Sequence, residues 1–200
     1  MKYLIKIPAM IRWLIARWPD GFRYLRYKRK YDIHRTFGFG GHDILFYGPG
    51  KISCGEGSYI GRYSQILSWE GCRVSIGNSC AISHFVKIYT MNNEADQDFR
   101  IPDSQRRIKT GDVNIGDHVW IGASVFINQG VEIGDNSVIG ANSVVTRSVP
   151  PHSIAVGVPA KVIKFKHYID ERTKQELIVR HWDCLCDKLR VEYSHLNPRP

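Results

Sequence analysis

Several side chains near the middle of the chain can accept a proton from a hydroxyl group. His84 is a candidate base, because the pKa of histidine lies close to neutrality. Three carboxylates, those of Glu94, Asp96 and Asp98, follow within a short stretch. Each group also has a structural interpretation, His84 as a turn or subunit-contact residue and the carboxylates as a solvated acidic loop. Which interpretation applies to each residue depends on the strands and loops that position it.

The cysteines give no sign of a metal centre or a disulfide framework. They are odd in number and without paired spacing: Cys54, Cys72, Cys80, Cys184 and Cys186. The last two form only a C-x-C pair, and no further cysteine or histidine completes a zinc-binding pattern. We therefore expect no metal and a reducing, cytoplasmic compartment.

An apolar residue recurs at every sixth position in the second half of the chain. The members of this series are Ile115, Ile121, Ile127, Ile133, Ile139 and Val145. Glycine follows four of them, at Gly116, Gly122, Gly134 and Gly140. A period of six fits neither a helix face nor a two-residue strand alternation. It predicts a parallel β-helix of hexapeptide repeats, in which each unit forms one short strand and one corner.

The same period occurs earlier, and its interruptions mark insertions. Two blocks share the spacing, Cys54, Ile60 and Ile66, and then Ile76, Ile82 and Ile88. Residues 67–75 break the spacing briefly, and residues 91–111 form a longer polar, charged insertion that contains proline. We therefore expect a β-helix domain over residues 37–165, with a loop over 91–111 on one face.

Basic residues are concentrated in the first 36 residues. Residues 1–35 contain ten Lys or Arg and two Asp or Glu, and therefore carry +8 of the formal net charge of +9. Tyrosine and tryptophan alternate with these cations, and the apolar runs are too short to span a bilayer. Two compatible interpretations are a cap over the open end of the solenoid and peripheral contact with an anionic membrane surface. No recognition motif supports nucleic-acid binding.

The last segment, residues 166–200, contains an amphipathic stripe. Apolar or aromatic residues recur at three- and four-residue spacing: Leu177, Ile178, His181, Trp182, Leu185 and Leu189. This spacing predicts a C-terminal helix over about residues 170–191. We expect it to pack on the solenoid or on a neighbouring subunit.

Residues 114–164, which contain the motifs VWIG and GVPAKVI, resemble the hexapeptide acyltransferases. Within them, the segment is most similar to the galactoside, maltose and polysaccharide O-acetyltransferase branch, and the resemblance covers roughly residues 48–165. The family implies a mainly β protein with a left-handed parallel β-helix. It also implies a homotrimer with active sites between subunits, and acetyl-CoA as the donor.

The resemblance implies roles for six residues in binding the donor and in acetyl transfer. Ala123 and Ala141 would turn their backbone to the pantetheine arm, Trp120 would stand beside the transferred acetyl group, and the phosphates or adenine would meet Arg147, Lys161 and Lys164. The structural interpretations are that the alanines are small because corners are tight, that the cations are solvated, and that the indole packs between subunits.

The expected catalytic base is missing. Aligned without gaps, residues 76–93 run through the family segment that ends in the catalytic histidine, and this position is Asn93. An asparagine amide can hydrogen-bond a hydroxyl but cannot accept its proton at neutral pH. Three accounts remain open: a histidine-to-asparagine variant, replacement of the base by His84 or a loop carboxylate, or a protein that binds without catalysing.

The same alignment implies acceptor-binding residues. Gln65 and Glu70 fall where sugar acetyltransferases carry an amide and a carboxylate, and Trp69 offers an apolar face for a sugar ring. Glu94, beside Asn93, is a further candidate. Trp69 also has a structural interpretation, as a subunit contact.

These inferences lead us to expect an acetyl-CoA-dependent sugar O-acetyltransferase of surface polysaccharide or glycolipid biosynthesis. It would be cytoplasmic, and peripheral at the cytoplasmic membrane if the basic segment binds there. Two alternatives stay open: an enzyme for a soluble nucleotide-linked sugar or antibiotic, and a catalytically silent trimeric binding protein.

Overall fold

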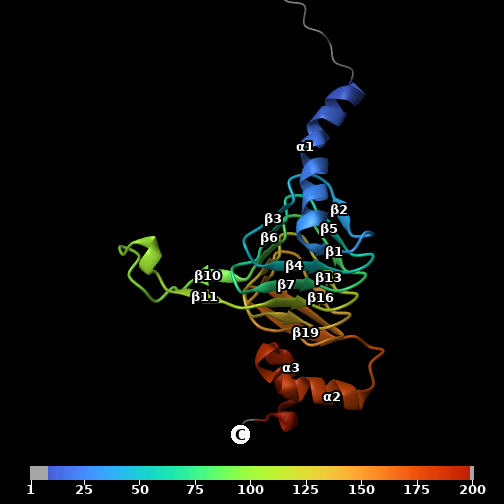
Figure 1. Ribbon diagram of the computed structural model, residues 1–200. Coiled ribbons are helices and arrows are strands. Elements are labelled where there is room, and N and C mark those ends of the chain that lie inside the picture. Colours follow the sequence, from blue (N-terminus) through green and yellow to red (C-terminus); the bar gives the residue numbers. More distant parts are fainter. Residues whose placement is uncertain (1–8, 199–200) are drawn as a thin grey trace, which may run out of the picture.

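The fold is a parallel β-helix whose coils each contribute one short strand to each of three sheets (Figure 1). The computed structural model describes residues 9–198, and their side chains from Asp20 onward. Sheet A contains β1 (Asp32–Ile33), β4 (Lys51–Cys54), β7 (Arg73–Ile76), β12 (Val113–Ile115) and β15 (Glu132–Ile133). Sheet B contains β2 (Gly38–Gly40), β5 (Tyr59–Gly61), β8 (Ala81–Ile82), β13 (Trp120–Ile121), β16 (Val138–Ile139), β18 (Ser153–Gly157) and β19 (Ala160–Phe165). Sheet C contains β3 (Leu45–Tyr47), β6 (Gln65–Leu67), β9 (Lys87–Tyr89), β14 (Phe126–Ile127) and β17 (Val144–Val145).

The core consists of columns of the recurring apolar residues. In sheet B, Ile60 pairs with Ile82, which pairs with Ile121, which in turn pairs with Ile139. All four side chains are fully buried. Burying one such side chain contributes about 1.5–3 kcal/mol, so the columns supply the main driving force for stacking the coils. The predicted β-helix of hexapeptide repeats is confirmed.

The corner between sheets B and C uses the left-handed backbone conformation at residues other than glycine. Positive φ angles occur at Tyr63 (60°), Phe85 (60°), Ser124 (58°) and Asn142 (59°), one in each successive coil. This conformation costs roughly 1–2 kcal/mol at such residues. Hydrogen bonds between coils offset the cost. The amide of Phe85 donates to the carbonyl of Arg62 at 3.0 Å, and equivalent bonds of 2.9 Å begin at Ser124 and Asn142.

Helix α1 (Ala9–Lys30) covers the open end of the first coil. The Tyr24 ring stacks on Phe39 with centroids 4.4 Å apart, and the Tyr27 ring stacks on Phe46 at 5.2 Å. The Tyr24 hydroxyl donates to the carbonyl of Gly41 at 2.8 Å, and burial raises the pKa of Tyr24 to about 12. The second half of the helix is therefore a cap.

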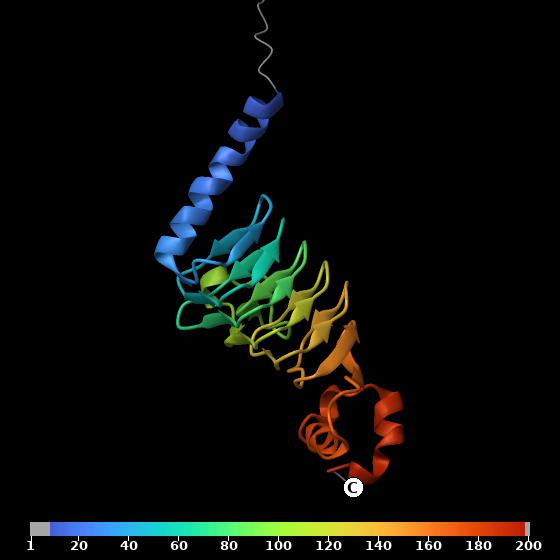
Figure 2. The same ribbon diagram turned by 90° about the vertical axis from the view of Figure 1, so that its right-hand side faces the viewer.

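The first half of α1 continues beyond the solenoid, as both ribbon views show (Figure 2). Within the basic segment expected to touch a membrane, residues 1–8 and the side chains of residues 9–19 lie outside the described part of the chain. Among residues 9–198, no helix combines the length and the apolar character that crossing a membrane requires.

The insertion over 91–111 is an antiparallel hairpin that projects sideways from the solenoid (Figure 1). It consists of β10 (Met91–Asn93), a 3₁₀ turn over Asp103–Gln105 and β11 (Ile108–Thr110), and it lies between β9 of sheet C and β12 of sheet A. The Asn92 amide donates to Asn128 Oδ1 at 3.0 Å and to Gln129 Oε1 at 2.6 Å. These bonds fix the base of the hairpin to the next coil.

The C-terminal segment is helical as predicted, but the single helix expected over about residues 170–191 is divided into two. The segment forms α2 (Glu171–Arg180), a 3₁₀ turn over Trp182–Cys184 and α3 (Asp187–Glu192), followed by a 3₁₀ turn over Ser194–Leu196. The helix is interrupted because Leu185 forms a parallel bridge with Val162 of β19, and the Cys186 amide donates to the Val162 carbonyl at 2.9 Å. A strand-type contact with the solenoid therefore replaces about one turn of helix.

Candidate active site

Trp120 stands on the outer face of sheet B. Its side chain is 58% exposed, whereas the next residue, Ile121, is fully buried and fixes the strand in the core. On the ladder, Trp120 pairs with Ala81 on one side and Val138 on the other. Because both neighbours are smaller than the indole, the ring protrudes from the sheet and is available to a ligand or a second copy of the chain.

The structure places His84 in one row with the two alanines expected to face the donor. Along the B–C corner, the Ser124 amide donates to the His84 carbonyl and the Asn142 amide to the Ala123 carbonyl, both at 2.9 Å. His84, Ala123 and Ala141 are thus equivalent residues of three successive coils. A Cβ atom at Gly61 would lie 2.4 Å from His84 Nδ1, so the imidazole occupies space that this glycine leaves free.

Two of the three cations expected to meet phosphates lie beside the 3₁₀ turn over Trp182–Cys184 in the C-terminal segment. Arg147 donates from Nη1 to the Asp183 carbonyl at 2.9 Å. Burial raises the pKa of the Cys184 thiol to about 11, and the positive charges of Lys161 and Arg147 act on it in the opposite direction. Lys164, further along β19, is exposed.

Gln65 lies on the outer face of sheet C, held by a tyrosine. The Tyr89 hydroxyl donates to Gln65 Oε1 at 2.8 Å. The Tyr89 ring is edge-on to Phe126, with centroids 5.2 Å apart, and to Tyr47 at 6.5 Å. This arrangement fixes the Gln65 amide so that its NH2 group can donate to a ligand hydroxyl.

Trp69 and Glu70 form a turn directly beside the base of the hairpin. The Trp69 amide donates to Thr90 Oγ1 at 2.8 Å, and the Trp69 carbonyl accepts from Cys72 at 3.0 Å. Glu70 is exposed at the tip, before Gly71 at φ +75°. Since Thr90 is the residue from which the hairpin leaves, the two insertions noted in the sequence meet at the C–A corner.

Asn93 is exposed on β10, and its strand partner is Ile108. Two of the three candidate carboxylates nearby, those of Glu94 and Asp98, are engaged with arginines. Glu94 Oε2 lies 3.3 Å from Arg107 Nε, and Asp98 accepts hydrogen bonds from Arg100 that lower the pKa of its carboxyl group. The lowered pKa makes Asp98 a weaker base, and the Glu94 carboxylate is engaged by Arg107.

The candidate residues fall into two groups that one chain does not bring together. Trp120 belongs to sheet B, whereas Asn93 projects from the corner between sheets C and A, which is opposite sheet B in a three-sided coil. His84 and Asn93 are likewise separated, because they flank opposite ends of β9. A site that contained both groups would need a second copy of the chain.

Comparison with known proteins identifies the family of this chain. The family model described as bacterial transferase hexapeptide (six repeats) matches residues 112–147. Galactoside O-acetyltransferase of Escherichia coli is 34% identical over 158 residues, which cover 74% of this chain and 76% of that protein. The chain belongs to the hexapeptide-repeat acetyltransferase family.

Further similar proteins support the assignment. Nodulation protein L of Rhizobium meliloti is 44% identical over 113 residues, or 56% of this chain. The crystal structure of a hexapeptide-repeat acetyltransferase from Vibrio cholerae in complex with acetyl-CoA has a TM-score of 0.63 and 28% identity, covering 73% of this chain and 77% of that one. The match spans 58% of the nodulation protein and 46% of an E. coli polysialic acid O-acetyltransferase, so the chain covers about half of these two relatives.

Two features of this member of the hexapeptide-repeat family were not predicted from its sequence. The first is the support of Gln65 by Tyr89. The two residues lie on neighbouring strands because this coil is 22 residues long and pairs Leu67 with Tyr89, and only that coil length could have indicated the contact. Arg180 and His181 join Arg147 around a cavity of about 170 Å³. Arg180 and His181 reach this cavity because the predicted helix is interrupted after them, and no local sequence pattern indicates that interruption.

Within residues 9–198, no group of three or more histidine, cysteine or acidic side chains is arranged to hold a metal ion.

Proposed function

We propose that this chain transfers an acetyl group from acetyl-CoA to a sugar hydroxyl of a surface polysaccharide or glycolipid. The observation that carries the proposal is the 34% identity to galactoside O-acetyltransferase over three quarters of both chains, including the coil that presents Trp120. The names of the relatives support a sugar acceptor, since they include a polysialic acid O-acetyltransferase.

The active form would be a homotrimer with each site between two copies. Support comes from the separation of Trp120 and Asn93 within one chain. The outer faces of sheets B and C also expose large apolar side chains, among them Tyr59 (48%), Tyr47 (39%) and Leu45 (37%). Apolar faces of this kind suit contact between subunits. In this arrangement, the hairpin of one copy would reach sheet B of the next.

The donor would lie along the B–C corner. Small side chains at Ala123 and Ala141, one coil apart, would let an extended pantetheine arm approach the backbone. Arg147 and Lys161 would meet the phosphates where the solenoid ends, because both already concentrate positive charge around Cys184. Trp120 would form a wall beside the thioester.

The reaction would be a direct transfer between the two bound substrates. The acceptor hydroxyl oxygen attacks the thioester carbonyl carbon, and the hydroxyl proton passes to solvent water because position 93 carries no base. The carbon–sulfur bond then breaks, and the departing CoA thiolate takes up a proton to give the thiol. A backbone amide would stabilise the oxyanion that forms. Asn93 would hydrogen-bond the acceptor hydroxyl without removing its proton, so turnover by this chain would be slow.

Asn93 also favours a second candidate function, that of a trimeric protein that binds donor and acceptor without acetyl transfer. The two functions differ in a single assay, the release of the CoA thiol from acetyl-CoA, followed with a thiol reagent. The acceptors would be washed membranes, a simple galactoside and a nucleotide-linked sugar, and acetylated products would be identified by mass.

Transfer to any of these acceptors that is reduced at least about tenfold by Trp120→Ala would support the enzyme. A preference for membranes over both soluble acceptors would support a glycolipid substrate. Binding of acetyl-CoA without thiol release under all three conditions would favour the silent binding protein, and absence of acetyl-CoA binding would contradict both.

A peripheral position at the membrane is part of the proposal for lipid-linked acceptors. Within the described part of α1, Phe22 (59%) and Leu25 (57%) are exposed, and Arg26 and Arg29 beside them are exposed as well. Apolar and cationic side chains on one helix suit the interface of an anionic bilayer. Sedimentation with vesicles, compared with Phe22→Ser/Leu25→Ser, tests this contact, and equal binding by the variant would contradict it.

A further inference from the structure

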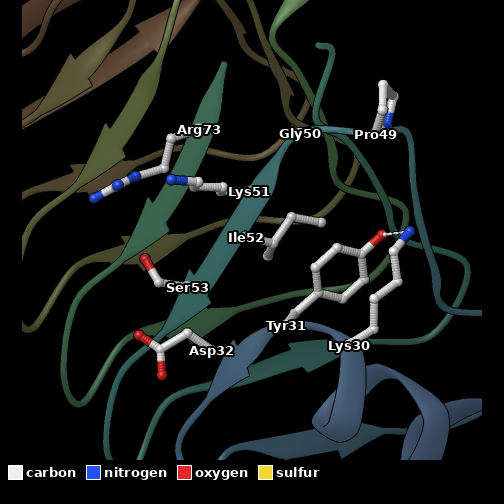
Figure 3. Close-up of a pocket in the computed structure, with 9 residues that line it drawn as sticks. All are labelled: Lys30, Tyr31, Asp32, Pro49, Gly50, Lys51, Ile52, Ser53 and Arg73. Carbon is white, nitrogen blue, oxygen red and sulfur yellow. Dashed lines mark hydrogen bonds between the residues drawn. The ribbon is translucent and has the colours of Figure 1, made fainter. Parts of the chain in front are cut away.

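A cleft lies on the outer face of sheet A, away from the side that carries Trp120. It consists of two adjoining cavities of about 380 Å³ and about 410 Å³, which share Pro49, Gly50, Lys51 and Arg73. Figure 3 shows the first of them, between the end of α1 and strands β4 and β7. Each cavity has a volume in the range of small-molecule sites.

The cleft is open because its floor is made of small residues. Ser53 and Ser75 face outward as ladder partners in adjacent coils, and they leave the backbone of sheet A accessible. At its edge the chain makes a tight corner through Gly48, at φ +97°, and Gly50. A Cβ atom at Gly50 would lie 2.2 Å from the Trp69 carbonyl oxygen, so this close corner requires glycine.

Three cations line the first cavity, against the single carboxylate of Asp32. Lys30 is held at the rim, since its Nζ donates to the Tyr31 hydroxyl at 2.9 Å (Figure 3). The same Nζ donates to the Gly48 carbonyl at 3.2 Å. Its charge therefore stays beside the cavity without an anionic partner among the described residues.

Lys51 and Arg73 are direct partners on the ladder between β4 and β7. Their Cα atoms are thus about 5 Å apart, with both side chains on the solvent face. Like charges placed opposite each other on a sheet repel and are destabilising. Among residues 9–198, neither has a carboxylate within ion-pair distance. Asp112, in the second cavity, instead accepts from the backbone amide of Arg73 at 2.8 Å. A bound anion would relieve the repulsion between the two cations.

We propose that the cleft binds a phosphate-bearing ligand that also carries hydroxyl groups. The phosphate lies between Lys51 and Arg73, which are cationic donors on adjacent strands, and neither cation forms an ion pair with the Asp32 or Asp112 carboxylate that lines the cleft. At the other end of the cavity, Asp32 accepts from a hydroxyl and Ser53 donates to one. A free sugar phosphate and the headgroup of a phosphatidylglycerol-type lipid share this chemistry. The proposal does not depend on acetyl transfer.

The test is calorimetric titration of the full chain with two probes, glucose 1-phosphate and dihexanoyl phosphatidylglycerol below its micelle concentration. The variant Lys51→Gln/Arg73→Gln should bind both probes at least about tenfold more weakly than the wild type. Each substitution removes a charged hydrogen bond to the phosphate, and such bonds contribute substantially to the affinity. The control Arg172→Gln/Lys188→Gln removes the same charge from the exposed surface of the C-terminal helices and should bind like the wild type. Glucose without phosphate should not compete.

The stronger of the two probes identifies the source of the phosphate. Because a sugar phosphate can also enter the proposed acetyl-transfer site, the cleft is assessed only from the difference between the double variant and its control. A second variant, Ser53→Phe, keeps every cation but fills the cleft, and it should also weaken binding about tenfold. Wild-type affinity in both cleft variants, or no binding of either probe by the wild type, would overturn the proposal.

Discussion

Placing a histidine at position 93 tests the proposed chemistry most directly. The Asn93 side chain is exposed on β10, and the strand is held through its backbone pairing with Ile108 and through the Asn92 anchor. Asn93→His therefore changes neither the core nor the hairpin base, and the melting temperature should stay the same. A positioned general base contributes roughly 10²–10⁴-fold to rate, or about 2.7–5.4 kcal/mol of transition-state stabilisation.

We accordingly expect thiol release from acetyl-CoA to rise by about 10²–10⁴-fold in Asn93→His. Only the neutral imidazole accepts a proton, so the rate of this variant should rise with pH through about 6.5 and then level off. Asn93→Gln is the matched control, because it keeps an amide and should show no gain.

His84 provides the competing explanation for any activity of the chain that carries Asn93. If His84 is the base, His84→Gln abolishes that activity, whereas our proposal predicts that it leaves the rate of Asn93→His within a factor of about three. The reasoning is refuted if Asn93→His binds acetyl-CoA normally but releases thiol no faster than Asn93→Gln with every acceptor.

Three further outcomes follow from the packing. Ile121→Ala, which empties a fully buried position of the sheet B column, should lower the free energy of unfolding in urea by about 2–5 kcal/mol. Tyr89→Phe removes the 2.8 Å hydrogen bond to Gln65 and should raise the acceptor KM up to about tenfold, with kcat unchanged, in steady-state assays. Burial lowers the pKa of His181, so its contribution to stability is present above the unfolded pKa of about 6.5 and is lost as pH falls; thermal melts of His181→Gln should show a weaker decline between about pH 6.5 and 5.

The hexapeptide period was sufficient to predict the solenoid, because its signal is repeated in every coil. Each recurring isoleucine enters a column, and even Ile121 stacks on Ile82 across the hairpin insertion. The C-terminal segment was harder. Its apolar spacing is typical of a helix, but the backbone at Leu185 forms a bridge with β19 and is therefore not helical. Local periodicity does not report such long-range competition.

The site was predictable residue by residue but not as an arrangement. Trp120 precedes a buried isoleucine, so its outward direction followed from strand alternation. Trp120 and Asn93 lie on different sides of the solenoid. This separation depends on which of the three sheets each coil segment joins and on the corner from which the hairpin leaves, and neither can be predicted from local sequence. The ion pair between Glu94 and Arg107 could not be predicted from the sequence either, because the two residues come together only when the hairpin forms.

A stack of parallel strands has no intrinsic length, since each layer exposes a template on which another can form. At the last layer, the segment around Leu185 occupies the outer edge of β19 and uses the Val162 carbonyl that an added strand would need. The residues after the solenoid thus cap this edge and block the addition of a further strand. Truncation ahead of that segment would leave the edge bare and turn a discrete molecule into a seed for end-to-end assembly.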